Sequence, residues 1–278
     1  MTRIAHISDL HFGALEPGAV RALTTALADA APTVIALSGD LTMRGRVREF
    51  RQASAFVESL GAPVVATAGN HDVPAYNPLA RFTRPTGRFR AAMQGVAMSA
   101  FAGNDLTLVA ANSARAWTAH WNWAHGAFSR AQIRRADAAL AGDPDPARWR
   151  GLVTHHPFEV PREMRSMRPV GKAASMLGVI AKRGVDFVLA GHLHHASWSF
   201  SAHAERALGR SVLLIQASTA TSSRRRDQPN AFNVIDLGPS ELRLTPWTLE
   251  GGAFGPGETI VFERSERGPT RTPQASRP

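Results

Sequence analysis

The chain has 278 residues, 44% of them hydrophobic, and a formal net charge of +10. This composition excludes a wholly disordered chain, and the length suits one large α/β domain. There is no cysteine, so disulfides and thiolate metal sites are excluded. Any metal must be held by His, Asp, Asn or water, a ligand set that suits Mn, Fe or Zn.

Helical patterns alternate with apolar runs in the first two-thirds of the chain. We expect strands at 4–7, 34–37, 64–67, 106–111, 152–154 and 187–190. We expect helices at 17–31, 45–60, 129–140 and 171–183, and a loop followed by a helix over 73–100. Ser129 is a candidate N-cap, and Pro17 fits the first turn of its helix. Continuous apolar strands between helices indicate sheets covered by helices.

Beyond residue 195 the pattern becomes β-rich. Strands are expected at 198–202, 212–215, 232–237, 241–249 and 259–262. We therefore predict a single domain over 1–264. The stretch 265–278 is rich in Pro, Arg and Ser without periodicity, and we expect it to be a disordered tail.

The positive charge comes almost entirely from arginine, since Lys172 and Lys182 are the only lysines. It fits attraction to phosphate-bearing substrates, nucleic acid or an anionic membrane surface, and it equally fits a compositional bias. No apolar stretch reaches membrane-spanning length, and the first strand follows Met1 almost at once. We expect a cytoplasmic protein, peripheral to the inner membrane if the charge serves membrane binding.

Polar residues follow directly on several of the predicted strands. The blocks are Asp9-Leu10-His11, Gly39-Asp40, Gly69-Asn70-His71-Asp72, His155-His156-Pro157 and Gly191-His192-Leu193-His194. Because α/β sheets gather such groups at the carboxyl ends of their strands, we expect these side chains to meet.

The residue types are those that a two-metal hydrolytic site requires. Asp9 and His11, two apart at a strand end, can reach one ion together. Asp40 follows a strand and a glycine and is the natural bridging carboxylate. Asn70 offers a neutral amide oxygen to a second ion, and His155, His192 and His194 complete the set. His6 lies within a strand and is expected to be a packed core histidine.

The ordered set of blocks, spanning roughly residues 3–195, resembles the calcineurin-like metallophosphoesterase superfamily. That resemblance implies a four-layer αββα sandwich and two bound metal ions. Asp9, His11 and His194 would hold the first ion, Asn70, His155 and His192 the second, and Asp40 would bridge them. His155 matches the family position better than its neighbour His156.

The resemblance also implies the chemistry. A hydroxide held between the ions would attack phosphorus, while His71 contacts the phosphate and assists the leaving oxygen. Asp72 would orient His71.

Candidate substrate contacts outside the blocks are Arg115, Trp117 and Phe158. Arg115 follows a strand end, and Trp117 opens an aromatic cluster with Trp121 and Trp123. Phe158 begins the segment 158–170, in which Met and Arg alternate. The aromatic cluster fits either a substrate wall or a locally packed loop. The segment 158–170 fits either a lid or an ordinary mobile loop.

Within the superfamily the chain is most similar to bacterial class III cyclic-nucleotide phosphodiesterases and glycerophosphodiesterases. This similarity predicts a phosphodiesterase acting on a small phosphodiester. One alternative is a membrane-surface hydrolase of a lipid-linked phosphodiester or pyrophosphate, which the arginines, the Met/Arg segment and the tryptophans would suit. Another is a nucleic-acid-binding protein, which no sequence motif supports.

Overall fold

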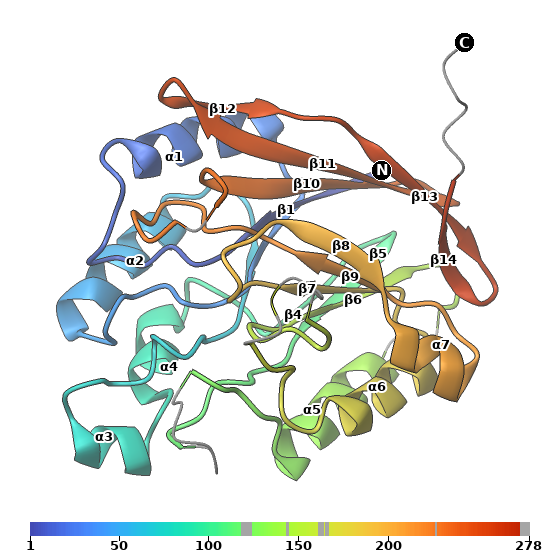
Figure 1. Cartoon of the computed structure of the whole chain (residues 1–278), viewed down its shortest axis with the longest axis horizontal. Coiled ribbons are helices and arrows are strands. Elements are labelled where there is room, and N and C mark those ends of the chain that lie inside the picture. The colour runs from blue at the N-terminus through green and yellow to red at the C-terminus, as the bar shows by residue number, and fades with distance from the viewer. Residues whose placement is uncertain (118–123, 143–144, 161–163, 165–166, 226, 273–278) are drawn as a thin grey trace.

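The computed structural model describes residues 1–117, 124–142, 145–160, 164, 167–225 and 227–272. Two β-sheets stack face to face, with helices on the outer side of each (Figure 1). This is the α/β, four-layer αββα sandwich expected from the sequence.

The first sheet joins both ends of the chain, in the order β14-β13-β11-β10-β1-β2-β3, with β12 paired to β11. Its strands are β1 (Thr2–Ile7), β2 (Val34–Leu37), β3 (Val64–Ala66), β10 (Ala231–Leu237), β11 (Glu241–Glu250), β12 (Ala253–Pro256), β13 (Ile260–Ser265) and β14 (Gly268–Arg271). Strands β1, β2 and β3 are parallel, whereas β10 runs antiparallel to β1. The carboxyl ends of β1, β2 and β3 therefore lie at one edge.

The second sheet has the order β4-β5-β6-β7-β9-β8. Its strands are β4 (Ala100–Ala102), β5 (Leu106–Ala110), β6 (Trp149–Val153), β7 (Phe187–Ala190), β8 (Ser197–Phe200) and β9 (Leu213–Gln216). The four central strands are parallel, and β4 and β8 are antiparallel edge strands. The loops after β6 and β7 thus leave the same edge of this sheet.

Three hydrophobic layers hold the sandwich together. The helices are α1 (Ala19–Ala30), α2 (Val47–Glu58), α3 (Pro78–Thr83), α4 (Gly87–Met93), α5 (Arg130–Ala141), α6 (Ala173–Lys182) and α7 (Ala202–Leu208). Leu23, Phe56 and Met93 pack α1, α2 and α4 on the first sheet. Leu140 and Met176 pack α5 and α6 on the second. Between the sheets lies an apolar cluster that includes Ile4, Val65, Trp149, Phe187 and Leu213.

Some predicted boundaries are wrong. Helix α1 begins at Ala19, because Gly18 takes a left-handed conformation (φ 78°) as the N-cap, so Pro17 precedes the helix. The strand expected at 198–202 ends at Phe200, and the Ser201 hydroxyl caps the unpredicted helix α7 by accepting from the Ala204 N–H.

The predicted disordered tail is also wrong in part. Ser265 ends β13, and Gly268–Arg271 form β14, which pairs with β13. The folded domain therefore extends past residue 264; residues 273–278 lie outside the described part. None of the described helices is both long and apolar enough to cross a membrane.

Candidate metal centre

The predicted ligands converge where the two sheets present the carboxyl ends of their parallel strands. They leave β1 (Asp9, His11), β2 (Asp40), β3 (Asn70), β6 (His155) and β7 (His192, His194). Five of them have positive φ angles: Asp9 53°, His11 51°, Asp40 53°, His192 72° and His194 53°. Backbones of this kind are uncommon outside glycine and concentrate at functional sites, where surrounding contacts maintain them.

Glycines allow these loops to approach one another. A Cβ on Gly39, where φ is +91°, would lie 2.8 Å from Nδ1 of His155. A Cβ on Gly69 would collide with the Asp40 carboxylate, and one on Gly191 with Ser8 and the Asp9 carboxylate. The glycines that precede the ligands in the sequence blocks are therefore required by close packing.

The first ligand group comprises Asp9, His11 and His194. Nε2 of His194 lies 3.1 Å from both Nε2 of His11 and Oδ1 of Asp9. Oδ2 of Asp9 accepts from the Ser8 hydroxyl at 2.5 Å and the His192 N–H at 3.0 Å. Oδ1 is buried and accepts no hydrogen bond from the described residues. Atoms that share one ion at about 2.1 Å lie roughly 3.0–3.5 Å apart, so this group fits a metal.

The second ligand group surrounds Nε2 of His155. This atom lies 3.1 Å from Oδ1 of Asn70 and 3.3 Å from Oδ2 of Asp40. The same Asp40 oxygen is 3.9 Å from Nε2 of His11, in the first group. Oδ1 of Asp40 accepts from the His71 N–H at 2.7 Å. Oδ2 is thereby left between the two groups, where a bridging carboxylate must stand.

His156 and His192 stand beside His155, and only one of them is available to an ion. The His192 ring lies edge-on to that of His155, with centroids 5.1 Å apart. Nε2 of His156 donates to the Ala124 carbonyl at 2.9 Å, so its Nδ1 accepts from the Ser113 hydroxyl at 2.7 Å. With both nitrogens of His156 engaged, His155 and His192 are the candidate ligands, as the sequence favoured.

Main-chain carbonyls fix the tautomers of two candidate ligands. Nδ1 of His155 donates to the Ser38 carbonyl at 2.8 Å, and Nδ1 of His194 donates to the Arg224 carbonyl at 2.6 Å. A neutral ring that donates at Nδ1 carries its lone pair on Nε2. Both Nε2 atoms face the carboxylates, which is the arrangement that metal-binding histidines need.

The buried carboxylates are held ionised. Burial raises the pKa of Asp9, but His194, His11 and His155 outweigh it, and the pKa lies well below its usual range. The pKa of Asp40 is likewise lowered, since His155 and His71 outweigh burial. Burial lowers the pKa of His155, yet the Asp40 carboxylate raises it to about 9. The pocket therefore attracts positive charge, which a bound cation would satisfy.

The predicted pairing of Asp72 with His71 is wrong. The Asp72 carboxylate accepts from the main-chain N–H groups of Leu41, Thr42 and Gly69 and from the Thr42 hydroxyl. It thus ties the loop after β3 to the loop after β2. The His71 ring is instead oriented by the Met43 carbonyl, which accepts from Nδ1 at 2.7 Å. A carbonyl acceptor leaves no signature in the sequence.

One of the three predicted substrate contacts is placed away from that role. Phe158 is 3% exposed and packs against Phe128 in the core, which contradicts the prediction that it meets substrate. Nε of Arg115 donates to the Ala127 carbonyl at 2.7 Å, within its own loop, and its contact with substrate stays a prediction. Trp117 is 60% exposed. Trp121, Trp123 and residues 161–163 and 165–166 of the segment 158–170 lie outside the described residues.

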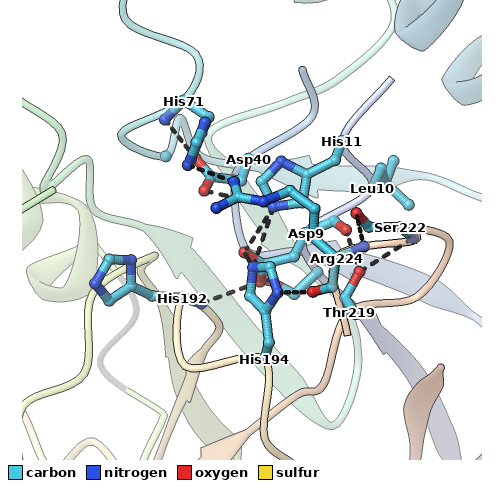
Figure 2. A network of polar contacts seen from close by, with 12 residues as sticks. Asp9, Leu10, His11, Asp40, His71, His192, His194, Thr219, Ser222 and Arg224 are labelled. Atoms are coloured by element: carbon cyan, nitrogen blue, oxygen red, sulfur yellow. Dashed lines mark hydrogen bonds and ion pairs between the residues drawn. The ribbon is translucent and has the colours of Figure 1, made fainter. Parts of the chain in front are cut away.

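One residue at the site has no counterpart in the predicted set. Nη1 of Arg224 lies 3.2 Å from Nε2 of His71, and the Arg224 carbonyl holds His194 (Figure 2). Arg224 is 30 residues beyond His194 and belongs to no block.

Comparison with known proteins agrees with this geometry. The family model for the calcineurin-like phosphoesterase matches residues 2–196. A probable cyclic nucleotide phosphodiesterase of Synechococcus sp. is 30% identical over 214 residues, covering 69% of this chain and 73% of that protein.

Solved structures share the fold. The purple acid phosphatase PPD1 of yellow lupin superposes with a TM-score of 0.70 at 14% identity, over 99% of this chain; the chain spans 57% of that enzyme. A dimetal phosphatase of Danio rerio gives a TM-score of 0.61 at 13% identity, over 94% of this chain and 98% of its own. At such low sequence identity, these structures support a shared fold and nothing further about function. The family model covers most of the chain, and the chain belongs to the calcineurin-like phosphoesterase family of metal-dependent phosphoester hydrolases.

Proposed function

We propose that the chain is a two-metal phosphodiesterase that hydrolyses a small phosphodiester. The observation that carries the proposal is the position of Asp40, whose Oδ2 stands between the Asp9–His11–His194 group and the Asn70–His155 group. A carboxylate oxygen between two ligand sets is the feature that separates a two-ion site from a single-ion site.

We assign the residues to the two ions as the family resemblance implies. Asp9, His11 and His194 would hold one ion, Asn70, His155 and His192 the other, and Asp40 both. Two such ions, when bound, acidify a water nucleophile and neutralise the phosphoryl oxygens. Nitrogen and oxygen donors of this kind suit Mn, Fe and Zn.

His71 is the residue proposed to serve the leaving oxygen. Its ring stands edge-on to His11, with centroids 4.9 Å apart, and its Nδ1 is committed to the Met43 carbonyl. Burial and the neighbouring His11 and Arg224 lower the pKa of His71, although Asp40 opposes them. The free ring is therefore neutral at pH 7. A bound phosphoryl group brings negative charge to Nε2, favours protonation there and lets His71 donate to the leaving oxygen.

The choice of a diester is supported by the similarity of the chain to a probable cyclic nucleotide phosphodiesterase of Synechococcus sp.. We therefore place cyclic nucleotides first and glycerophosphodiesters second among the substrates. Both present one anionic phosphoryl group and an alkoxide leaving group, the demands that the two ions and His71 meet.

Turnover of matched substrates tests this proposal. Protein loaded with Mn, Fe or Zn is assayed on bis-p-nitrophenyl phosphate, p-nitrophenyl phosphate, 3′,5′-cyclic AMP and glycerophosphocholine. We expect the aromatic diester to be hydrolysed much faster than the monoester, with one of the two natural diesters also turned over. Faster hydrolysis of the monoester would make the protein a phosphomonoesterase and contradict the proposal.

A further inference from the structure

Residues 219–221 of the loop after β9 are hydrogen-bonded to residues 8–10, at the end of β1. The Ala220 N–H donates to the Ser8 carbonyl at 2.9 Å. The hydroxyls of Thr219 and Thr221 donate to the carbonyls of Asp9 and Leu10 at 2.6 and 2.7 Å. Both threonines are fully buried. Three hydrogen bonds thus join the loop after β9 to the segment that carries Asp9.

A second set of contacts fixes the end of this loop. The side-chain amide of Asn230 donates to the carbonyls of Thr219 and Ser222, the latter at 2.9 Å. The Ser222 hydroxyl in turn accepts from the Arg224 N–H at 3.0 Å. The backbone of Arg224 is therefore held in place by buried neighbours, although its side chain is exposed.

Arg224 faces the site through two different groups. Its carbonyl accepts from Nδ1 of His194, while its guanidinium reaches across the cluster to His71 (Figure 2). Because Nδ1 of His71 donates to Met43, Nε2 is the acceptor and the guanidinium the donor. Nη1 also lies 3.7 Å from Sδ of Met43. Among the described residues, the exposed guanidinium is thus held beside His71 by one hydrogen bond and a longer contact with the Met43 sulfur.

We propose that Arg224 is a phosphoryl-binding residue, which donates to a non-bridging oxygen of the substrate beside His71. This inference rests on the proposed function. Nη1 and Nε2 of His71 are 3.2 Å apart, so one phosphoryl group can meet both. A guanidinium has five donors in a planar fork suited to phosphate oxygens, and the contact to His71 uses one of them. Hydrolysis turns a singly charged diester into a more highly charged monoester, and the fixed cation stabilises that gain of negative charge.

The neighbouring arginine supplies a matched control. Arg225 is adjacent in the chain, its side chain is 43% exposed, and it pairs with Glu16 at 3.5 Å rather than with the site. Arg224→Gln and Arg225→Gln therefore remove the same charge from the same loop. Arg224→Lys keeps the charge but loses the fork.

Inhibition by inorganic phosphate separates phosphate binding from a structural role. In metal-loaded protein we expect Arg224→Gln to raise the inhibition constant for phosphate, and KM for the diester, by about 10- to 100-fold, the range of a charged hydrogen bond. Arg224→Lys should recover part of this loss, and Arg225→Gln should match the wild type. Metal content should be unchanged in all three, because the main-chain carbonyl, not the side chain, holds His194.

Two outcomes would overturn the inference. In the first, Arg224→Gln lowers kcat but has the same inhibition constant for phosphate as Arg225→Gln. The side chain would then only hold the His71 ring in position. In the other, Arg224→Gln loses metal, so that it is structural. Failure of the proposed function looks different: the wild type itself would hydrolyse no diester, while calorimetric titration with phosphate would still report the role of Arg224.

Discussion

Asp40 is the residue that contacts both candidate ligand groups. Its side chain is 1% exposed, one oxygen accepts from the His71 N–H, and the other stands between two histidines of different ligand groups. Burying a carboxylate is costly unless it is paired. The surrounding histidines compensate that cost in the free protein, and cations would do so in the loaded one.

His71→Asn should separate catalysis from metal binding. The variant keeps the main-chain N–H that Asp40 accepts from, so both ions should remain bound. Loss of a group that donates to the leaving oxygen should lower kcat by about 10²- to 10⁴-fold. Steady-state kinetics alongside metal analysis checks this; an unchanged kcat would remove His71 from the mechanism.

Because of the buried His6, we expect the free energy of unfolding to decrease in acid. It is fully buried, with Nε2 2.9 Å from the Ser38 hydroxyl, so the expected core histidine is confirmed. Burial lowers its pKa to about 3. In the unfolded chain the pKa of His6 is about 6.5, so below that pH the unfolded chain binds a proton at His6 and the folded chain does not. The free energy of unfolding therefore falls as the pH drops from about 6.5 toward 3.

Replacing His6 should flatten that dependence. When the pH is lowered from 7 to 5, titration of His6 should reduce the unfolding free energy of the wild type by about 2 kcal/mol. The His6→Gln variant should not show this part of the decrease. Urea unfolding of both proteins at the two pH values measures it. Equal losses in the two proteins would show that His6 does not titrate in this way.

At the level of single residues, the sequence predicted the features that depend on side chains with distinctive chemistry. The candidate ligand set follows from Asp, Asn and His residues directly after strands. The carbonyls of Ser38, Met43 and Arg224, which orient three histidine rings, could not be predicted, because every residue has a carbonyl. Phe158 was misplaced because nearness to His155 in sequence does not decide which way the chain turns after β6.

At the level of elements, the ends of β1 and β7 determine the first ligand group, although they belong to different sheets. Gly191 follows β7 and leaves no room for a side chain against Ser8 and Asp9, while the next N–H, of His192, donates to Asp9. The two sheets must therefore stay in register at this edge for Asp9 and His194 to meet.

Gly191→Ala should damage the metal centre. The added methyl would push the loop after β7 away from Asp9, and metal affinity should fall about 10- to 100-fold, as when an outer partner of a ligand is lost. Gly178→Ala is the control, since a Cβ there meets nothing within 4 Å and alanine suits the interior of α6 better. Equal metal affinity in both variants, measured by competition with a chelator, would refute this account.

Elements with strong apolar patterns were predictable and those without were not. β7 lies at the predicted residues, and Ser129 caps α5 by accepting from the Gln132 N–H. The missed strands include β12 and β14, which are four-residue edge segments that contain Gly and Pro, and α7 buries little beyond Ala204. Such elements depend on pairing with the rest of the sheet more than on local sequence.

At the level of the whole molecule, part of the arginine excess serves the fold. Arg210 and Arg264 pair with the buried Asp186 at 3.0 and 3.3 Å, and Arg150 donates to the carbonyls of Arg183 and Asp145. These contacts lie beside β6, β7 and β13 rather than at the ligand edge. A net charge of +10 is therefore weak evidence for an anionic partner.

In the proposed mechanism, one folded domain brings two metal ions to one phosphoryl group. Titration of metal into chelator-stripped protein, followed by hydrolysis of bis-p-nitrophenyl phosphate, tests it most directly. We predict no turnover without metal, maximal turnover at two equivalents per chain, and none at any loading in Asp40→Ala. Full turnover at one equivalent, or in the stripped protein, would contradict the two-metal account.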